Sequence, residues 1–398
     1  MWSEVLRQDL HLIRNYGIIS TQHDLHQKGG DYMANMLDYL DWRGDVPFSA
    51  DPFNENDALV LAELGYVPLE HTVPESFHVR IRLRDAAQRF RKDAVGDFDR
   101  IYSFDTDCEL LQKMAHSVRF GNTQLTGYIN RIDNDELLQF SALTCLLEDG
   151  TTFVSYRGTD GSLVGWKEDL AFSYLVRTPA QNYAVEYLNG FFTVHPRPIR
   201  IGGHSKGGNL SMYAASFCSP DIRSRITEVY SFDGPGFRDE IVDSPEYQSM
   251  IPKIRSFIPE SSFVGMLLAT GLDHAVIRSN ENGIRQHCAY TWELSRHGLL
   301  RADELSKNSM LINKVMNGWL ADYDDEERRV FVQSVFDILG ASDHDTFREI
   351  NQNRRKSYPA MIKALAALSP EQQGVLFDAL KKIVRSGKDA IMKPDDEK

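Results

Sequence analysis

The segment Gly203-His204-Ser205-Lys206-Gly207 combines a serine hydroxyl with a glycine on either side. Residues 199–201 before it favour a strand, and residues 210–215 after it suit a buried helix. Glycine is needed at both flanks of such a strand-to-helix turn, because a Cβ there would collide with neighbouring backbone. The turn would present Ser205 beside the backbone N–H of Lys206 and the positive end of the helix. The pattern predicts a nucleophilic serine; the alternative is a glycine-rich turn with an incidental serine.

A serine hydroxyl at its ordinary pKa is a poor nucleophile, so a base is required later in the chain. The order expected for a nucleophile on such a turn is serine, then an acid, then histidine. Two of the following histidines are candidates for the base: His287 lies in a loop-like stretch, and His274 begins a predicted strand at 274–278. His297 and His344 are expected in exposed helical or loop positions.

The acid has two main candidates, each at the end of a predicted strand. Asp233 follows the strand at 226–232 and opens the turn Gly234-Pro235-Gly236, and Glu260 follows the strand at 253–258. The carboxyl ends of parallel strands are where α/β sheets place catalytic groups. We favour Asp233, because a short side chain on a proline-stiffened turn is well held; the bland alternatives are a turn-forming aspartate and a surface glutamate. Asp273 is a weaker third option.

The elements that would position these residues alternate between strand and helix. A hairpin is predicted from residues 137–147 and 151–156 around Asp149-Gly150. Helices at 166–175 and 180–192, the strand at 199–201, a helix to about residue 217 and the strand at 226–232 follow. This alternation predicts an α/β fold with a largely parallel sheet covered on both faces.

Outside this core the pattern is helical. Residues 1–35 are predicted as an N-terminal helical extension, residues 36–300 as the α/β domain, and residues 301–398 as a C-terminal helical region. A short helix is expected from Asp57, as a candidate N-cap, to Gly65. The C-terminal helices are expected at residues 303–319, 325–339, 345–368 and 370–386.

Composition narrows the class of protein. The 398 residues carry a formal charge of −13, which argues against nucleic acid or an anionic bilayer as the main partner. No run of eighteen apolar residues and no signal-like start is present, and the four cysteines follow no metal or redox spacing. We therefore expect reduced thiols, no transmembrane segment and a cytoplasmic location. Transient contact with a membrane surface is compatible with these expectations.

A second segment adds an oxyanion-stabilising candidate and a family resemblance. Arg157-Gly158-Thr159 after a strand, then Trp166 and Asp169-Leu170, then Gly-His-Ser-x-Gly-Gly, resembles the class 3 (fungal-type) lipases of the α/β-hydrolase superfamily. The resemblance implies that Thr159 lies at the oxyanion hole, through its N–H and its hydroxyl, together with Lys206. It also favours His287, since the lipase histidine lies in a similar late loop. An ordinary strand-end turn is the alternative for residues 157–159.

A closer resemblance is to the bacterial Mbeg1-like family of lipase-like domains, over about residues 34–300. It implies an α/β-hydrolase fold. The motifs that carry this resemblance are residues 35–45, 52–57, 203–209, 233–237 and 262–267.

Two positions depart from the lipase pattern. Where lipases have an aspartate followed by Ile-Val-Pro, this chain has Ser261-Ser262-Phe263-Val264, so the acid must come from elsewhere. Lys206 stands where lipases usually have a leucine-like residue. We expect its side chain to point outward, because lysine is rarely buried; the alternative is that its charge contacts a polar head group.

The function implied is hydrolysis of a carboxylic ester through an acyl-enzyme, with no metal or organic cofactor. Lipid esters, lysophospholipids, smaller esters and thioesters fit the same residues. Residues 263–272 could line an acyl pocket, form a lid or belong to the core. The competing interpretations are a serine acyltransferase and a non-catalytic interaction protein that uses the C-terminal helices as its binding surface.

Overall fold

The structure is a computed structural model that describes residues 34–91, 104–192 and 197–392. The described residues belong to one compact unit, which begins at Ala34. The predicted extension at residues 1–35 falls almost entirely outside the described residues, as does the end of the chain from residue 393.

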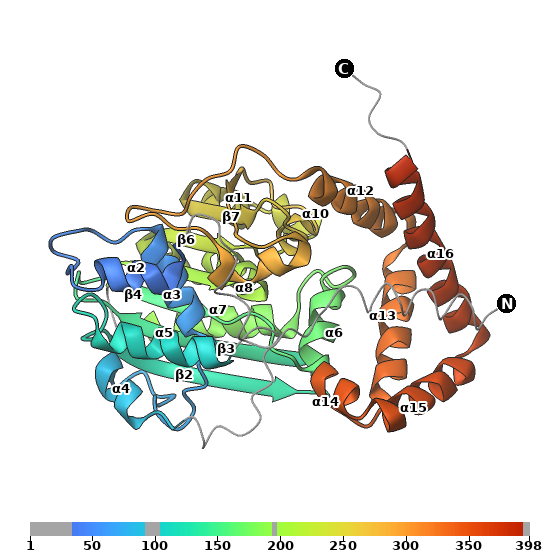
Figure 1. The fold of residues 1–398 in the computed structure, drawn as a ribbon, viewed down its shortest axis with the longest axis horizontal. Coiled ribbons are helices and arrows are strands. Elements are labelled where there is room, and N and C mark those ends of the chain that lie inside the picture. Colours follow the sequence, from blue (N-terminus) through green and yellow to red (C-terminus); the bar gives the residue numbers. More distant parts are fainter. Residues whose placement is uncertain (1–33, 92–103, 193–196, 393–398) are drawn as a thin grey trace. The chain divides into compact units, whose positions relative to one another are not determined.

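An eight-stranded sheet organises the described chain, with the strands side by side in sequence order (Figure 1). Strands β1 to β4 pair antiparallel, and β4 to β8 pair parallel. The strands are β1 (Ile81–Arg82), β2 (Gln124–Asp133), β3 (Leu138–Leu146), β4 (Thr152–Tyr156), β5 (Ile199–His204), β6 (Ile226–Phe232), β7 (Ile254–Pro259) and β8 (His274–Ile277).

The predicted hairpin and the predicted strands of the parallel part are present. β3 and β4 form the hairpin, and Gly150 in its turn has a φ of +85°, a conformation that glycine adopts easily. β2 was not predicted; its residues 125–128 are buried, and its residues 131–133 are exposed. The parallel register pairs Tyr156 with Gly203 and His204 with Phe232, so the carboxyl ends of β4, β5 and β6 share one edge.

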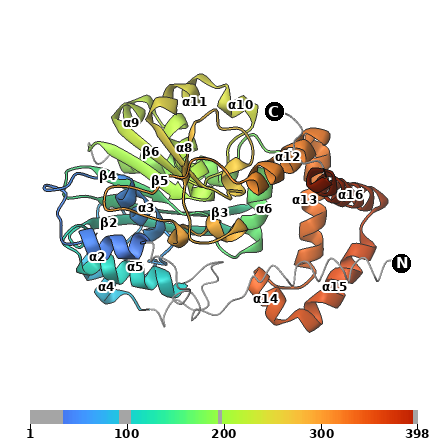
Figure 2. The same cartoon turned by 45° about the horizontal axis from the view of Figure 1, so that its top comes forward.

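Helices cover both faces of the sheet (Figure 2). One core contains residues of α2 (Met36–Arg43), α3 (Glu55–Leu64), α4 (Leu83–Arg89) and α5 (Phe104–His116). The other contains residues of α7 (Pro179–Phe192), α8 (Lys206–Phe217), α9 (Pro220–Arg225), α10 (Asp239–Val242) and α11 (Pro245–Met250). Neighbouring strand residues divide between the two cores, as Phe153 and Val154 do, because successive side chains point to opposite faces.

The helix predicted to start at Asp57 starts earlier. Asn54 is the N-cap of α3, and Asp57 stands three residues on, where its side chain accepts a hydrogen bond from the backbone N–H of Asn54. This reciprocal capping box satisfies donors at the helix start that would otherwise have no partner. The predicted end at Gly65 is confirmed.

The C-terminal part of the unit is helical, as predicted, and packs on α6 (Leu163–Ala171). The expected helix at 345–368 is two helices, because Asn353, with a φ of −101° and a ψ of 22°, leaves the helical conformation. Its side-chain amide donates to the carbonyl of Glu349 over 3.0 Å. The five helices are α12 (Lys307–Asp322), α13 (Asp325–Gly340), α14 (Phe347–Gln352), α15 (Arg354–Ala367) and α16 (Pro370–Met392). Among the described residues, no helix has both the length and the apolar character required to cross a membrane.

Candidate active site

Ser205 stands in the turn between β5 and α8, with a φ of +58° and a ψ of −132°. This conformation is unusual for a residue with a side chain and is held by the close packing around it. A Cβ on Gly203 would lie 2.4 Å from the carbonyl oxygen of Tyr156, and one on Gly207 would lie 2.1 Å from the same atom. Both glycines are therefore required for α8 to start this close to β4.

His287 meets the serine from a late loop. Its Nε2 lies 3.0 Å from Ser205 Oγ, a distance at which the hydroxyl donates to the imidazole. The loop is the short 3₁₀ helix η4 (Gly283–His287), and the residue before the histidine anchors it. Gln286 Oε1 accepts from the N–H of Ser261 over 2.6 Å, and the carbonyl of Gln286 accepts from the indole of Trp292 over 2.7 Å.

Asp233 stands on the other side of His287. His287 Nδ1 donates to Asp233 Oδ2 over 2.6 Å. The other carboxylate oxygen accepts from the Ser262 hydroxyl over 2.5 Å and from the N–H of Gly265 over 3.0 Å. Because the side chain is fully buried and receives donors on both oxygens, it has one orientation. Ser262, in the segment Ser261-Ser262-Phe263-Val264, therefore helps to fix the carboxylate of Asp233.

The alternative residues lie elsewhere. His274 Nδ1 contacts the Ser256 hydroxyl at 2.8 Å, and its Nε2 contacts the Thr270 hydroxyl at 3.2 Å. Burial lowers the pKa of His274, against the opposite influence of nearby aspartates. The backbone of Glu260 pairs with β8 and with the N-cap of α12, and Asp273 is exposed. The hydrogen-bonded chain from Ser205 therefore runs through His287 to Asp233.

The backbone after β4 passes directly beside the serine. A Cβ on Gly158 would lie 3.0 Å from Ser205 Cβ and 2.1 Å from the Tyr66 hydroxyl oxygen. The next residue, Thr159, donates its hydroxyl to Asp169 Oδ2 over 2.6 Å. This bond fixes the threonine side chain to α6.

The expectation that the Lys206 side chain points outward is wrong. Lys206 is 1% exposed, and its Nζ donates to the carbonyl of Gln139 over 2.8 Å, to Gln139 Oε1 over 2.5 Å and to Glu168 Oε2 over 3.0 Å. A cation in the first turn of a helix opposes the helix dipole, and a buried cation needs a counter-charge. Glu168 supplies that charge: its side chain is fully buried, and its Oε2 lies 3.0 Å from Lys206 Nζ. The general rarity of buried lysine could not indicate that this lysine has a buried partner.

Asp169 joins this lysine cluster to Thr159. Its Oδ1 lies 3.9 Å from Lys206 Nζ, and burial raises the pKa of the Asp169 carboxyl to about 6, against the lowering effect of Lys206 and of the Thr159 hydrogen bond. Glu168 and Gln139 were not among the residues expected at the site. Asp169 was part of the lipase-like pattern, but no role was assigned to it. The adjacent carboxylates Glu168 and Asp169, on a predicted helix after Thr159, were the sequence signal for a charged cluster near the site.

The segment 263–272 runs beside the turn that holds Asp233. Phe237 donates its N–H to the carbonyl of Ala269 over 2.7 Å and accepts from the Ala269 N–H over 3.1 Å, and Gly236 donates to Leu267. The use of this segment as an acyl pocket or lid stays a prediction.

A sheet with parallel strands, helices on both faces, and a strained serine turn between β5 and α8 defines an α/β-hydrolase fold. Within that class the chain belongs to the Mbeg1-like family, whose model matches residues 114–337. The match begins later than the expected resemblance over residues 34–300 and extends into α13.

Two lipases are among the solved structures to which the chain is similar. M37 lipase is 14% identical to this chain, with a TM-score of 0.34; the match covers 54% of this chain and 70% of the lipase. The Rhizomucor miehei lipase propeptide complex is 14% identical over 75% of this chain and 87% of its own, with a TM-score of 0.35. A search of curated proteins returned no match.

Proposed function

We propose that this protein is a serine hydrolase that cleaves carboxylic esters of small molecules or lipids through an acyl-enzyme. The observation that carries the proposal is the hydrogen-bonded chain from Ser205 Oγ to His287 Nε2, 3.0 Å, and from His287 Nδ1 to Asp233 Oδ2, 2.6 Å. A nucleophile, a base in contact with it and a buried acid that orients the base are the parts that acyl transfer requires.

In the proposed mechanism Ser205 attacks the ester carbonyl while His287 Nε2 takes the hydroxyl proton. The imidazolium is stabilised by Asp233 and then gives its proton to the leaving alcohol. Water, activated by the same histidine, attacks the acyl-enzyme and releases the acid.

We assign the oxyanion site to the backbone N–H groups of Thr159 and Lys206. Lys206 directly follows the serine at the first position of α8, and Gly158 brings the backbone of the Thr159 segment against Ser205. Two fixed donors at this place would face the charge that develops on the carbonyl oxygen, and each such donor is worth about 3 kcal/mol of transition-state stabilisation.

A fluorophosphonate probe tests the proposal directly. We expect covalent labelling of the wild-type chain and no labelling of Ser205→Ala. The control is Ser211→Ala, which removes another buried serine, in α8, and should be labelled like the wild type. Lack of labelling of the folded wild-type protein would favour a non-catalytic role for the scaffold.

The substrate class is then narrowed with p-nitrophenyl esters of increasing chain length. Ester hydrolysis predicts free acid as the product even when an acceptor alcohol is added. A new ester as the main product would instead identify an acyltransferase, and preference for a matched thioester would identify a thioesterase. We also propose a cytoplasmic location, since the cysteine spacing predicts thiols; fractionation of cells that produce the protein checks it.

A further inference from the structure

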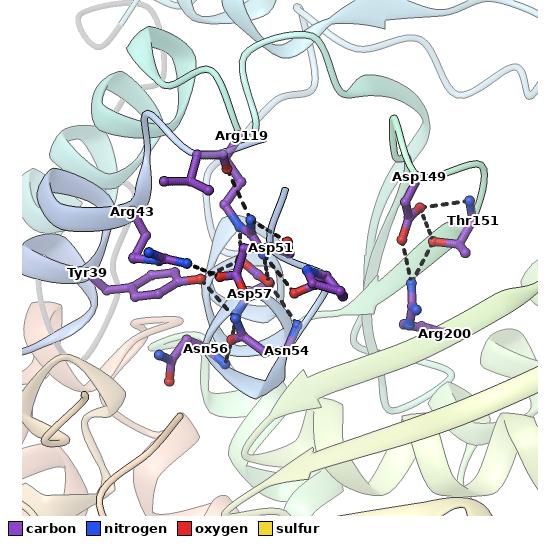
Figure 3. A network of polar contacts seen from close by, with 12 residues as sticks. Tyr39, Arg43, Asp51, Asn54, Asn56, Asp57, Arg119, Asp149, Thr151 and Arg200 are labelled. Carbon is purple, nitrogen blue, oxygen red and sulfur yellow. Dashed lines mark hydrogen bonds and ion pairs between the residues drawn. The ribbon is translucent and has the colours of Figure 1, made fainter. Parts of the chain in front are cut away.

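The motifs at residues 35–45 and 52–57 take no part in the proposed reaction, and the structure shows that they build the support of α3 (Figure 3). Asp57 is the centre of this support. Tyr39 donates its hydroxyl to Asp57 Oδ1 over 2.9 Å, and Arg119 donates to Oδ1 over 2.6 Å and to Oδ2 over 2.5 Å. The side chains of Asp57 and Arg119 are fully buried, so each would be an uncompensated buried charge without the other. The start of α3 is therefore fixed in one position.

The other end of α3 brings two side chains to His204, the residue before the proposed nucleophile. Glu63 Oε1 lies 3.2 Å from His204 Nδ1, and the Tyr66 hydroxyl lies 3.3 Å from the same nitrogen. This end of the helix is held on β4, where Ser155 donates its hydroxyl to the carbonyl of Ala62 over 3.2 Å. Glu63 and His204 are each 1% exposed, so their contact is shielded from solvent.

The second ring nitrogen of His204 faces the backbone of the proposed base. His204 Nε2 lies 2.7 Å from the carbonyl oxygen of His287. The centroids of the two imidazole rings are 4.7 Å apart, and the ring planes make an angle of 35°. A carbonyl oxygen can only accept, so His204 Nε2 carries a hydrogen. A carboxylate can also only accept, so pairing with Glu63 requires a second hydrogen on Nδ1, and His204 in this pair is an imidazolium. His204 thus connects α3 with the loop that carries His287.

We propose that Glu63 and His204 form a second acid–histidine pair whose task is to position His287. The proposal rests on the function proposed above. Glu63 orients the His204 ring, and His204 Nε2–H holds the His287 carbonyl, so that His287 Nε2 stays within reach of Ser205 Oγ. His204 and Glu63 are positioning residues, because they act through His287. A buried histidine that only fills the core is the alternative, and it predicts loss of stability without a specific loss of turnover.

The test compares His204→Phe, which keeps a ring but cannot donate, with His204→Gln, which keeps an N–H donor. His116→Gln, at an exposed histidine of α5, is the control. Turnover of the best p-nitrophenyl ester and the rate of fluorophosphonate labelling are measured together with the thermal unfolding of each variant.

We expect His204→Phe to lower kcat about 10- to 100-fold with KM within about 2-fold, because small displacements of a base have effects of this size. His204→Gln should recover most of the loss, and His116→Gln should match the wild type. Equal losses in the two His204 variants, or no loss in either, overturn the positioning role while labelling of the wild type still supports the proposed function. Absence of labelling in the wild type overturns the proposed function itself.

Glu63→Gln provides a second measurement that decides the case where His204→Phe does not fold. We expect kcat to fall at least about 5-fold with unchanged KM, because the amide orients the His204 ring less firmly than a carboxylate does. Unchanged kcat in a folded Glu63→Gln protein contradicts the proposal.

Discussion

At the scale of single residues, the main finding is that Asp233, and not Glu260, is hydrogen-bonded to His287. We expect Asp233→Asn to lower kcat by about 10³- to 10⁴-fold, because an amide in this place favours the wrong tautomer of the histidine. Glu260→Gln is the matched control and should keep nearly full turnover. Ester hydrolysis by both variants at a single pH checks this, and a large loss in Glu260→Gln with little in Asp233→Asn would reverse the assignment.

The buried carboxyl of Asp169 predicts a pH dependence of stability. Its pKa is about 6 in the folded protein, whereas the ordinary value is 3.8. Between these values the folded state binds more protons than the unfolded state, so this group makes the protein more stable as the pH falls from 8 to 5. The side chain is 24% exposed, and the effect amounts to at most about 1.4 kcal/mol over that range.

The variant Asp169→Asn lacks this ionisation and retains an oxygen that can accept from Thr159. We expect the difference in free energy of unfolding, wild type minus variant, to be larger at pH 5 than at pH 8. Urea unfolding of both proteins at the two values measures it. A difference that stays constant with pH would show that Asp169 ionises in the folded protein as easily as in the unfolded chain.

At the scale of elements, the contact between β4, β5 and α8 sets the serine turn. The strained conformation of Ser205 exists because the first turn of α8 lies against the carbonyl of Tyr156. The local sequence predicts such a turn, but the closeness of β4 to it is a tertiary property.

We therefore expect Gly207→Ala to destabilise the protein by at least about 2 kcal/mol, because the new Cβ would lie 2.1 Å from a backbone oxygen that cannot move freely. Gly374→Ala in α16 is the matched change in an exposed helix, with nothing within 4 Å, and should raise stability by about 0.5–1 kcal/mol. Chemical unfolding compares the two. Similar effects of the two substitutions would mean that the packing of α8 on β4 is looser than described.

At the scale of the whole molecule, the C-terminal helices contact the elements that hold the site. Leu163 of α6 packs with Val332, Phe336 and Ile350, and α6 also carries Asp169. Ser306 donates its N–H to the carbonyl of Glu260 over 2.7 Å, and Ser309 donates its hydroxyl to the carbonyl of Ser262. The division into a domain at residues 36–300 and an appendage at 301–398 stays a prediction. These contacts raise the question of whether the two parts unfold together.

Phe336→Ala tests it, with Ile362→Ala as the control on the exposed side of α15, where the side chain is 66% exposed. We expect Phe336→Ala to lower the free energy of unfolding by about 3 kcal/mol and to shift a single cooperative transition of the whole unit. Ile362→Ala should change it by no more than about 0.5 kcal/mol. Two separate transitions, of which Phe336→Ala moves one, would show that the C-terminal helices fold independently.

The sequence by itself determined the features that depend on neighbouring residues. Glycines at 203 and 207 and the β-formers at 199 and 201 specify the turn of Ser205, because a sharp strand-to-helix connection is a local property of the chain. The alternation of strands and helices determined the α/β class in the same way, and the order of serine, acid and histidine limited the partners to a few residues.

Only the tertiary structure decided which of those residues meet. Asp233, Glu260 and Asp273 are equivalent as carboxylates. The donors Ser262 and Gly265, from the segment that follows β7, select Asp233. Lys206 is buried because Glu168 and Gln139, distant in sequence, compensate its charge. The contacts of His204 with Glu63 and with the His287 carbonyl arise likewise across three separate segments. Such contacts depend on the packing of the sheet and its helices, which local patterns of residue type do not encode.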